Sequence, residues 1–242
     1  MLARAGGRRE EADVGGYEGA IEAAWPKVTG EGFGPVRTDA GLRAMLGEIA
    51  ARDPDVARVL PLVGHPAARA RDPGFATLLR IITAQQISTL AANAIWGRLA
   101  TLLGDPVEPA AYLRATGEQL RAVGLSARKA GYGHALATAF AEGGLDAALL
   151  DGMDDEAVIQ AITRLPGLGR WSAEIYLLFA MGRADAFPAD DLAIQVGFQR
   201  LKRLDARPKA KELRGQIEHW APYRGAGAIL LWEVYGAATL DP

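Results

Sequence analysis

Apolar residues recur at three- and four-residue intervals through most of the chain from Asp39 onward, and glycine or proline separates segments of helical length. This spacing puts the apolar side chains of each segment on one helix face, the pattern of helices packed around a core. It predicts helices over about 40–51, 75–83, 87–103, 118–123, 127–142, 154–164, 170–181, 191–203, 209–219 and 225–236. No set of segments alternates with the period of strands. The sequence therefore predicts an all-α body.

The first 38 residues differ from this body because glycine and charged residues dominate and no helical period is sustained. Ile21, Trp25 and Phe33 are large enough to anchor a short piece against the rest of the protein. We predict a flexible or partly docked N-terminal segment over 1–38 and a helical body of two lobes over 39–242. One lobe centres on 75–185, and the helices nearest the two ends of the chain form the other.

The composition of the chain mainly excludes certain kinds of site and partner. Of the 242 residues 50% are hydrophobic and 23% charged, and the formal net charge is −2, so no strong positive field announces a polyanionic partner. The absence of cysteine excludes disulfides, zinc sites with thiolate ligands, a cysteine nucleophile and cysteine-bound iron–sulfur clusters. No apolar run approaches the roughly 18 residues of a membrane span. We expect a soluble, cytoplasmic protein without a membrane partner.

The segment Leu165-Pro166-Gly167-Leu168-Gly169 joins two predicted helices and has the glycine spacing of a helix-hairpin-helix turn. Such a turn presents backbone N–H groups at the start of the second helix, where the helix dipole favours an anion such as a DNA phosphate. The alternative is a plain connection between helices. As DNA contacts we predict Gly167, Leu168, Gly169, Arg170 and Ser172.

Two carboxylates follow the second hairpin helix. Asp190 and Asp191 directly precede an apolar helical stretch that starts at Leu192, so either aspartate is suited to cap that helix. We assign the cap, or a supporting hydrogen bond, to Asp190 and the reactive carboxylate to Asp191. Hairpin and carboxylate together indicate an enzyme that grips a nucleic-acid backbone and places an aspartate against one nucleotide.

Several motifs occur in the order found in one family. They are Arg80-Ile81-Ile82-Thr83-Ala84-Gln85-Gln86-Ile87-Ser88, Gly124-Leu125-Ser126-Ala127-Arg128-Lys129-Ala130, the hairpin with Asp191, Trp220-Ala221-Pro222-Tyr223-Arg224, and Trp232. From about residue 42 to 236 the chain resembles the helix-hairpin-helix DNA glycosylases, and among them the 3-methyladenine DNA glycosylase II group. The resemblance implies a two-lobed helical glycosylase fold. It is to a compact form, because the short glycine-rich start has no room for the N-terminal β-rich domain of larger members.

The resemblance also implies roles for individual residues. Asp191, which begins the family's Asp-x-x-Ile pattern with Ile194, matches the catalytic aspartate. Trp232 and Trp171 match walls of the pocket for the extruded base, and Tyr176 is a further pocket residue; the alternative for the tryptophans is core packing.

Two further motifs carry expected DNA contacts. The resemblance places Gln85 and Gln86 near the minor groove and the orphaned partner base. Their alternative is a polar helix face or a buried structural hydrogen bond. Leu125 lies in the loop expected to hold the wedge that fills the space left by the flipped base.

The reaction implied is monofunctional hydrolysis of alkylated purines in base-excision repair, because Trp171 stands where glycosylases with lyase activity carry a Schiff-base lysine. We expect a monomer that binds double-stranded DNA containing alkylated bases and requires no cofactor. The three histidines show no metal-ligand spacing. The resemblance does allow a structural alkali cation on the hairpin carbonyls.

Two other functions stay open from the sequence. A non-catalytic helix-hairpin-helix DNA-binding module would need the turn but not Asp191 with two pocket tryptophans. A glycosylase for oxidised or mismatched bases is less compatible with the missing hairpin lysine and the missing cysteines.

Overall fold

The computed structural model describes residues 35–238, and every regular element in that range is a helix, which confirms the all-α prediction. The expectation for the N-terminal segment falls, up to residue 34, outside the described residues. None of the described helices is long and apolar enough to cross a bilayer. In chain order the elements are η1 (Pro35–Arg37), α2 (Asp39–Arg52), α3 (Pro54–Val63), α4 (Phe75–Ala84), α5 (Thr89–Leu103), α6 (Pro109–Arg114), α7 (Gly117–Ala122), α8 (Ala127–Ala141), α9 (Ala147–Asp151), α10 (Asp155–Thr163), α11 (Arg170–Phe179), α12 (Leu192–Lys202), α13 (Ala210–Gln216), η2 (Glu218–Trp220) and α14 (Arg224–Gly236).

The spacing of apolar residues did not predict three of these helices, α3, α6 and α9. Helix α3 begins with Asp53 as its N-cap and Pro54 in its first turn, a recognisable start, but Pro61 interrupts the pattern inside it. Helices α6 and α9 have six and five residues. So few residues give only a weak periodic signal, and of the three shortest α-helices only α7, also six residues long, was predicted.

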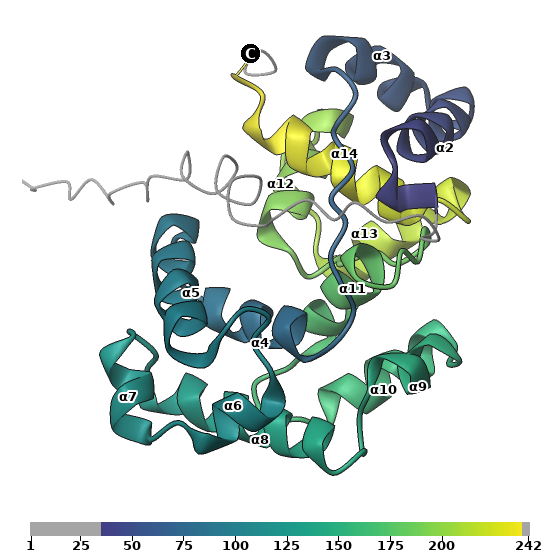
Figure 1. The fold of residues 1–242 in the computed structure, drawn as a ribbon. Coiled ribbons are helices and arrows are strands. Elements are labelled where there is room, and N and C mark those ends of the chain that lie inside the picture. The colour runs from purple at the N-terminus through teal and green to yellow at the C-terminus, as the bar shows by residue number, and fades with distance from the viewer. Residues whose placement is uncertain (1–34, 239–242) are drawn as a thin grey trace, which may run out of the picture.

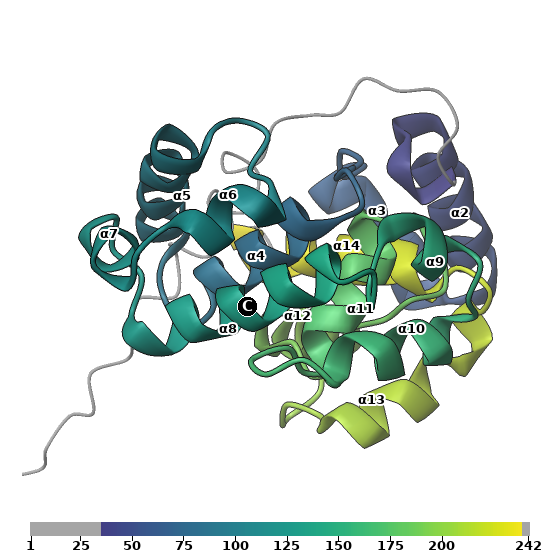
Figure 2. The same cartoon turned by 60° about the horizontal axis from the view of Figure 1, so that its bottom comes forward.

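The helices form two lobes, as predicted (Figure 1). One lobe packs α12 against α14 and places α2 and α3 beside them, so it combines both ends of the described chain. The other contains α4 to α8, with α8 in contact with α4, α6 and α7. Helix α11 contacts α4 and α10 and lies between the lobes (Figure 2), while residues 64–74 run from α3 across to α4 (Figure 1). Any group carried by α11 or by the 64–74 segment is therefore close to both lobes.

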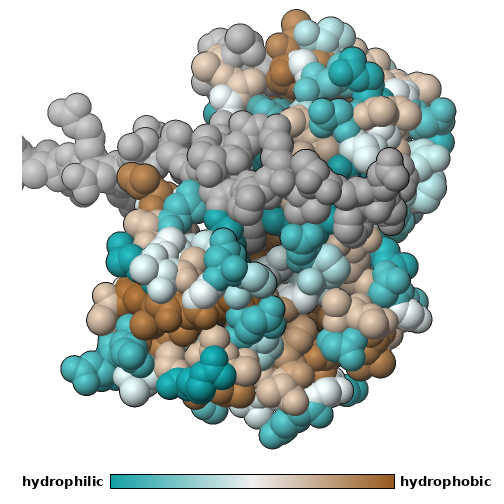
Figure 3. Space-filling model, viewed as in Figure 1, coloured by the Kyte–Doolittle hydropathy of each residue, from teal (hydrophilic) through white to brown (hydrophobic). Residues whose placement is uncertain are grey.

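The surface shows no large uniform patch on the face drawn in Figure 3, where hydrophilic and hydrophobic residues are mixed and one hydrophobic band crosses the lower lobe. Within residues 35–238 the exposed large apolar side chains are spread over four helices: Leu62 on α3, Leu90 and Leu102 on α5, Leu149 on α9 and Leu192 on α12. Scattered exposure of this kind is ordinary for a globular protein.

Helices α12 and α14 approach closely because Gly197 has no side chain. A Cβ atom at this position would lie 2.1 Å from the backbone oxygen of Leu231. Backbone cannot move aside as a flexible side chain can, so the glycine sets the separation of the two helices. The next residue on α14 is Trp232, whose indole reaches the start of α12. The helix contact thus determines where this tryptophan lies.

We predict that Gly197→Ala destabilises the protein by about 1–3 kcal/mol, because the added methyl group must push the helices apart. Gly47→Ala is the matched control, since it is also inside a helix but has open space around its Cα. The control should gain up to about 1 kcal/mol from its higher helix propensity. Urea unfolding of the two variants measures both effects, and equal changes in stability would contradict the packing argument.

A buried carboxylate ties α3 to α12 and η2. The side chain of Asp53 caps α3 and accepts hydrogen bonds from Lys202 Nζ (2.7 Å) and Trp220 Nε1 (2.8 Å), and His219 Nε2 lies 2.9 Å away. Burial alone would raise its pKa, but the hydrogen bonds from Lys202, Trp220 and His219 outweigh burial and lower the pKa of Asp53 to about 2. The ionised form is therefore part of the folded structure.

This network predicts the acid sensitivity of the fold. Because the pKa of Asp53 is lower in the folded protein than in the unfolded chain, its contribution is present above about pH 4 and is lost as the pH falls towards 2. We expect about 2 kcal/mol of unfolding free energy to disappear over that range. Asp53→Asn should show a shallower pH dependence than the wild type between pH 5 and about 2, measured by urea unfolding. Parallel curves for the two proteins would rule out this role.

Candidate active site

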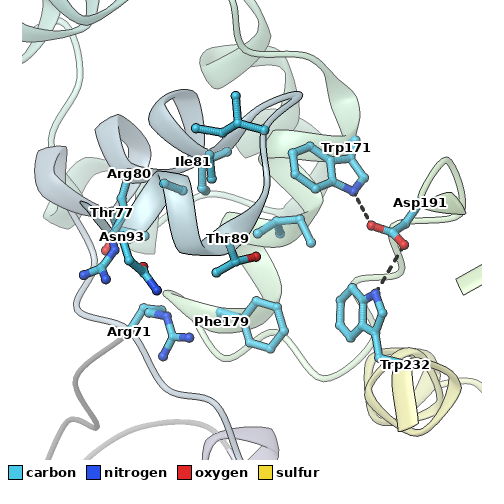
Figure 4. Close-up of a pocket in the computed structure, with 14 residues that line it drawn as sticks. Arg71, Thr77, Arg80, Ile81, Thr89, Asn93, Trp171, Phe179, Asp191 and Trp232 are labelled. Carbon is cyan, nitrogen blue, oxygen red and sulfur yellow. Dashed lines mark hydrogen bonds between the residues drawn. The ribbon is translucent and has the colours of Figure 1, made fainter. Parts of the chain in front are cut away.

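Three helix faces and one connecting segment line a pocket of about 100 Å³ (Figure 4). Helix α4 contributes Thr77, Arg80, Ile81 and Ala84; α5 contributes Thr89, Ala92 and Asn93; and α11 contributes Trp171, Ile175 and Phe179. Each set recurs at three- or four-residue spacing, so each helix presents one stripe to the pocket. Ile87 from the α4–α5 loop, Arg71 from the 64–74 segment, Asp191 and Trp232 complete the lining.

Asp191 lies at the N-terminus of α12 and is only 5% exposed. Its Oδ1 accepts hydrogen bonds from Ile194 N at 3.1 Å and from Trp232 Nε1 at 3.2 Å, and its Oδ2 accepts one from Trp171 Nε1 at 2.9 Å. All three partners donate, so they satisfy an ionised carboxylate. The carboxylate is thus oriented from three helices at the edge of the pocket.

The assignment of the helix cap to Asp190 is wrong. Asp191 is both the N-cap of α12 and the carboxylate in the pocket, whereas the Asp190 side chain is 53% exposed and lies 3.7 Å from Arg214. The sequence showed two adjacent candidates at the helix start. Only the direction in which the loop enters α12 decides which of them turns inward.

The loop that leads into Asp191 is held from two sides. Arg214 of α13 donates to Phe187 O at 3.1 Å and to Glu174 Oε1 of α11 at 2.8 Å. Gln195 of α12 donates to Ala189 O at 2.7 Å. These contacts hold the residues just before Asp191 against both neighbouring helices, which limits the positions available to its carboxylate.

The two predicted pocket tryptophans also act as hydrogen-bond donors to Asp191, a function that the sequence did not indicate. Trp232 is 4% exposed and stacks on Phe179, with ring centroids 5.6 Å apart and planes inclined by 26°. Trp171 is more exposed and lines the pocket from α11. Their role in stacking on an extruded base stays a prediction.

Tyr176 is not a pocket residue. It is fully buried, and its Oη accepts a hydrogen bond from Gly74 N at 2.8 Å, which fastens the 64–74 segment to α11. Burial raises the pKa of Tyr176 to about 12. Its place one helix turn after Ser172 turns it away from the stripe formed by Trp171, Ile175 and Phe179, so the prediction of a pocket role is wrong.

The hairpin turn fits its expected geometry at Gly167. This residue has φ = +84°, and a Cβ there would lie 2.2 Å from the Tyr132 ring, so both the turn and the packing against α8 require glycine. Gly169 is exposed, has open space around it and provides no side-chain cap for α11. The first N–H groups of α11 therefore face a space that an anion is able to approach.

The other hairpin residues are less suited to contact DNA than predicted. Leu168 N donates to Leu165 O, and the side chains of Leu168 and Ser172 are buried. Arg170 is exposed, but its guanidinium binds Glu156 at 3.0 Å and Glu174 at 3.0 Å, so its charge is offset within the protein. The backbone at Gly169 and Arg170 is better suited to such a contact, because both residues are exposed and no side chain caps α11.

The adjacent glutamines have different roles. Gln85 Nε2 donates to Gly167 O at 2.8 Å, so this side chain ties the α4–α5 loop to the hairpin. Gln86 is exposed and has φ = +58°, an uncommon conformation for a residue other than glycine. It lies between Ala84 and Ile87, which both line the pocket, and so sits at its rim.

Leu125 is buried, with 3% exposure, and its N–H donates to Leu120 O. A wedge must project from the protein surface, so the structure contradicts the assignment of this role to Leu125. Apolar size was the reason for choosing it, and apolar size is equally the property of a core residue.

Arg71, Arg80, Asn93, Thr77 and Phe179 were not predicted as site residues. Phe179 was detectable, since it continues the four-residue spacing of Trp171 and Ile175. Arg71 carries no such signal because it lies in a connecting segment without a period. Its backbone N–H donates to Phe179 O at 2.9 Å, which places it beside the pocket.

An alkali cation at the hairpin stays a prediction. Backbone carbonyl oxygens are suitable ligands for a hard cation. Leu165 O and Gly167 O each accept one hydrogen bond, from Leu168 N and Gln85 Nε2, and each keeps a second lone pair. These two carbonyls fit such an ion. Among residues 35–238 no group of three or more histidine, aspartate or glutamate side chains is arranged to hold a metal.

The sequence is similar to those of several 3-methyladenine DNA glycosylases. DNA-3-methyladenine glycosylase 1 of Schizosaccharomyces pombe is 32% identical over 183 residues, which are 73% of this chain and 80% of that protein. DNA-3-methyladenine glycosylase 2 of Escherichia coli is 26% identical over 168 residues, covering 65% and 56% of the two chains.

Solved structures show the same arrangement of helices. The S. pombe 3-methyladenine DNA glycosylase in complex with abasic DNA has a TM-score of 0.75 and 29% identity, covering 81% of this chain and 98% of that one. A DNA-3-methyladenine glycosidase from Bacillus halodurans has a TM-score of 0.73 and 30% identity, covering 81% and 90%. The two-lobed glycosylase fold expected from the motifs is confirmed. Residues 79–222 match the family described as HhH-GPD superfamily base excision DNA repair protein, and the chain belongs to that superfamily.

Proposed function

We propose that this protein is a monofunctional DNA glycosylase that hydrolyses the N-glycosidic bond of alkylated purines in double-stranded DNA. The observation that carries the proposal is the buried carboxylate of Asp191, oriented by two indole N–H groups at the edge of a narrow, mostly apolar pocket. The names of the relatives and structural neighbours, 3-methyladenine glycosylases, support the substrate class.

The base must leave the duplex before its glycosidic bond reaches Asp191. Unstacking and unpairing cost a few kcal/mol, and contacts to the backbone and to the vacated space offset this cost. The N-terminus of α11, which follows the exposed Gly169, is suited to one phosphate. Gln86 at the pocket rim is suited to enter the vacated space, because it is exposed and close to the pocket.

Asp191 acts as the glycosidic bond stretches. Positive charge then develops on the deoxyribose, and a fixed carboxylate stabilises it without reorganisation. Water adds to the sugar carbon, its proton is taken up by Asp191, and the bonding electron pair leaves with the purine nitrogen. The products are a free base and an abasic site. Among the residues that the structure describes, no lysine lines the pocket, which supports hydrolysis without a Schiff base.

We also propose that the active form is a monomer. A DNA-binding module without activity would not need a buried carboxylate with two indole donors, so the enzyme is the better explanation.

We predict that Asp191→Asn lowers the release of 3-methyladenine and 7-methylguanine from methylated duplex DNA by about 100-fold or more, because the charge that stabilises the sugar cation is lost. Asparagine also caps helices well, so α12 and the fold should persist. Release of free base is measured without added metal, together with thermal unfolding.

Asp190→Asn is the control, because it changes the adjacent carboxylate, which is exposed and outside the pocket. It should retain activity within a few-fold of wild type. Near-normal base release by a folded Asp191→Asn protein would refute the mechanism.

A second pair of variants distinguishes the role of Gln86 in opening the duplex from the role of Leu125 in the core. We expect Gln86→Ala to lower base release from duplex DNA by roughly tenfold and to have a smaller effect on single-stranded DNA, where no duplex must be opened. Leu125→Ala should instead lower the stability by about 2–5 kcal/mol, because it leaves a cavity in the core. If Gln86→Ala reduced release equally from both substrates, the residue would have no part in opening the duplex.

A further inference from the structure

A further buried carboxylate, Glu174, lies in the second turn of α11. It is 2% exposed, and its Oε1 accepts hydrogen bonds from Arg170 Nε at 3.0 Å and from Arg214 Nη2 at 2.8 Å. Its Oε2 is buried as well, and no residue in the described part of the chain donates to it. Two arginines from different helices therefore share one oxygen, while the lone pairs of the other oxygen are unused.

This arrangement is costly for the fold. Burial raises the pKa of the Glu174 carboxyl above its usual value, although Arg214 and Arg170 act in the opposite direction. A buried ion pair often stabilises a protein no better than apolar side chains of the same volume, and an unsatisfied buried oxygen adds a further cost. Stability alone therefore gives little reason for a carboxylate here. The positions of its two partners indicate a reason in function.

Arg214 connects Glu174 to the loop that carries Asp191. Its Nη2 donates to Glu174, and its Nη1 donates to Phe187 O at 3.1 Å. Phe187 O also accepts from Ala189 N at 2.9 Å, so it belongs to the tight turn that leads into Asp191. The guanidinium thus anchors that turn to α11.

The planar guanidinium fork makes this anchor directional. When a buried, fixed acceptor binds one nitrogen of the fork, the direction of the other nitrogen is set as well. Asp190 Oδ2 is a weaker partner, because it lies 3.7 Å from Arg214 Nη2 on an exposed side chain. Glu174 is therefore the carboxylate that orients Arg214 towards Phe187 O.

Arg170 connects the same carboxylate to the hairpin. It is the first residue of α11 and is exposed, and its Nη1 and Nη2 bind Glu156 of α10 at 3.2 and 3.0 Å while its Nε binds Glu174. A phosphate at the N-terminus of α11 competes with both carboxylates for this guanidinium. The pair with Glu156 is exposed and weak, whereas Glu174 holds Arg170 from inside the protein.

We propose that Glu174 is a positioning residue that fixes the loop of Asp191 through Arg214 and competes with a DNA phosphate for Arg170. The inference rests on the proposed glycosylase function and adds to it a residue outside the pocket. A misplacement of about 1 Å near the reacting groups lowers a rate by about 100-fold. Glu174 thus supports the rate of base release while it weakens DNA binding, so its two effects have opposite signs.

The test measures two quantities for Glu174→Gln. One is the rate constant of 7-methylguanine release from methylated duplex DNA under saturating enzyme, which does not depend on the fraction of folded protein. We expect it to fall by about 10- to 100-fold, because the neutral amide no longer holds the Arg214 fork. The other is the Kd for a duplex with a stable abasic-site analogue. Binding should be a few-fold tighter, with a log–log salt slope steeper by up to about 0.9, because Arg170 becomes free to contact one phosphate.

Glu156→Gln is the matched control. It also removes a carboxylate from Arg170, but Glu156 is exposed on α10 and is not among the partners of Arg214 in the described residues. This variant should tighten DNA binding to a similar extent and keep a rate constant close to that of the wild type.

Arg214→Lys gives a second test that leaves the buried carboxylate in place. Lysine keeps the positive charge beside Glu174, but its single nitrogen cannot replace the fork that reaches both Glu174 and Phe187 O. The rate constant should fall as it does in Glu174→Gln. A double variant should be no slower than the slower single variant, because the two residues act as a unit.

A folded Glu174→Gln protein with the rate constant of the wild type overturns the inference. So does an equal fall in Glu156→Gln, or a double variant in which the two losses multiply. Weaker DNA binding by Glu174→Gln contradicts the competition for Arg170. A wild type that releases no methylated base refutes the proposed function itself, whatever the variants do, so the two failures are distinguishable.

Discussion

The carboxylate of Asp191 joins four parts of the molecule through three hydrogen bonds. It caps α12, accepts from Trp171 of α11 and Trp232 of α14, and ends the loop that Arg214 holds in place. The carboxylate and the three N–H groups that donate to it would each be costly to bury without a hydrogen-bond partner, and the three bonds satisfy them. The relative positions of three helices are therefore coupled to the orientation of one side chain, and the close contact of α12 with α14 at Gly197 is part of the same arrangement.

The pocket combines a preorganised anion with a positive opposite side. The anion matches charge that develops on the sugar during bond cleavage, and it is held by donors that need not move when the charge appears. Phe179 lies between the two sides, stacked on Trp232 and with the Arg71 guanidinium 6.0 Å from its ring centroid.

Local patterns made much of the fold predictable. The long helices follow from a sustained apolar period, and the hairpin from two glycines at the right spacing, of which Gly167 is required by its positive φ. The short helices α6 and α9 left no period to detect. In the site, Asp191 and the two tryptophans were found because they lie in motifs, whereas Arg71 was missed because a connecting segment has no pattern.

The sequence by itself determined the helical architecture, the hairpin and the presence of a carboxylate at the start of α12, because these depend on residues close together in the chain. Tertiary structure decided which of two aspartates turns inward, that Tyr176 and Leu125 are buried, and that Arg71 reaches the pocket. The physical reason is that size and polarity are properties of the residue itself, whereas its burial and charge environment depend on the residues that surround it. Those neighbours come from segments far apart in the chain, which only packing brings together.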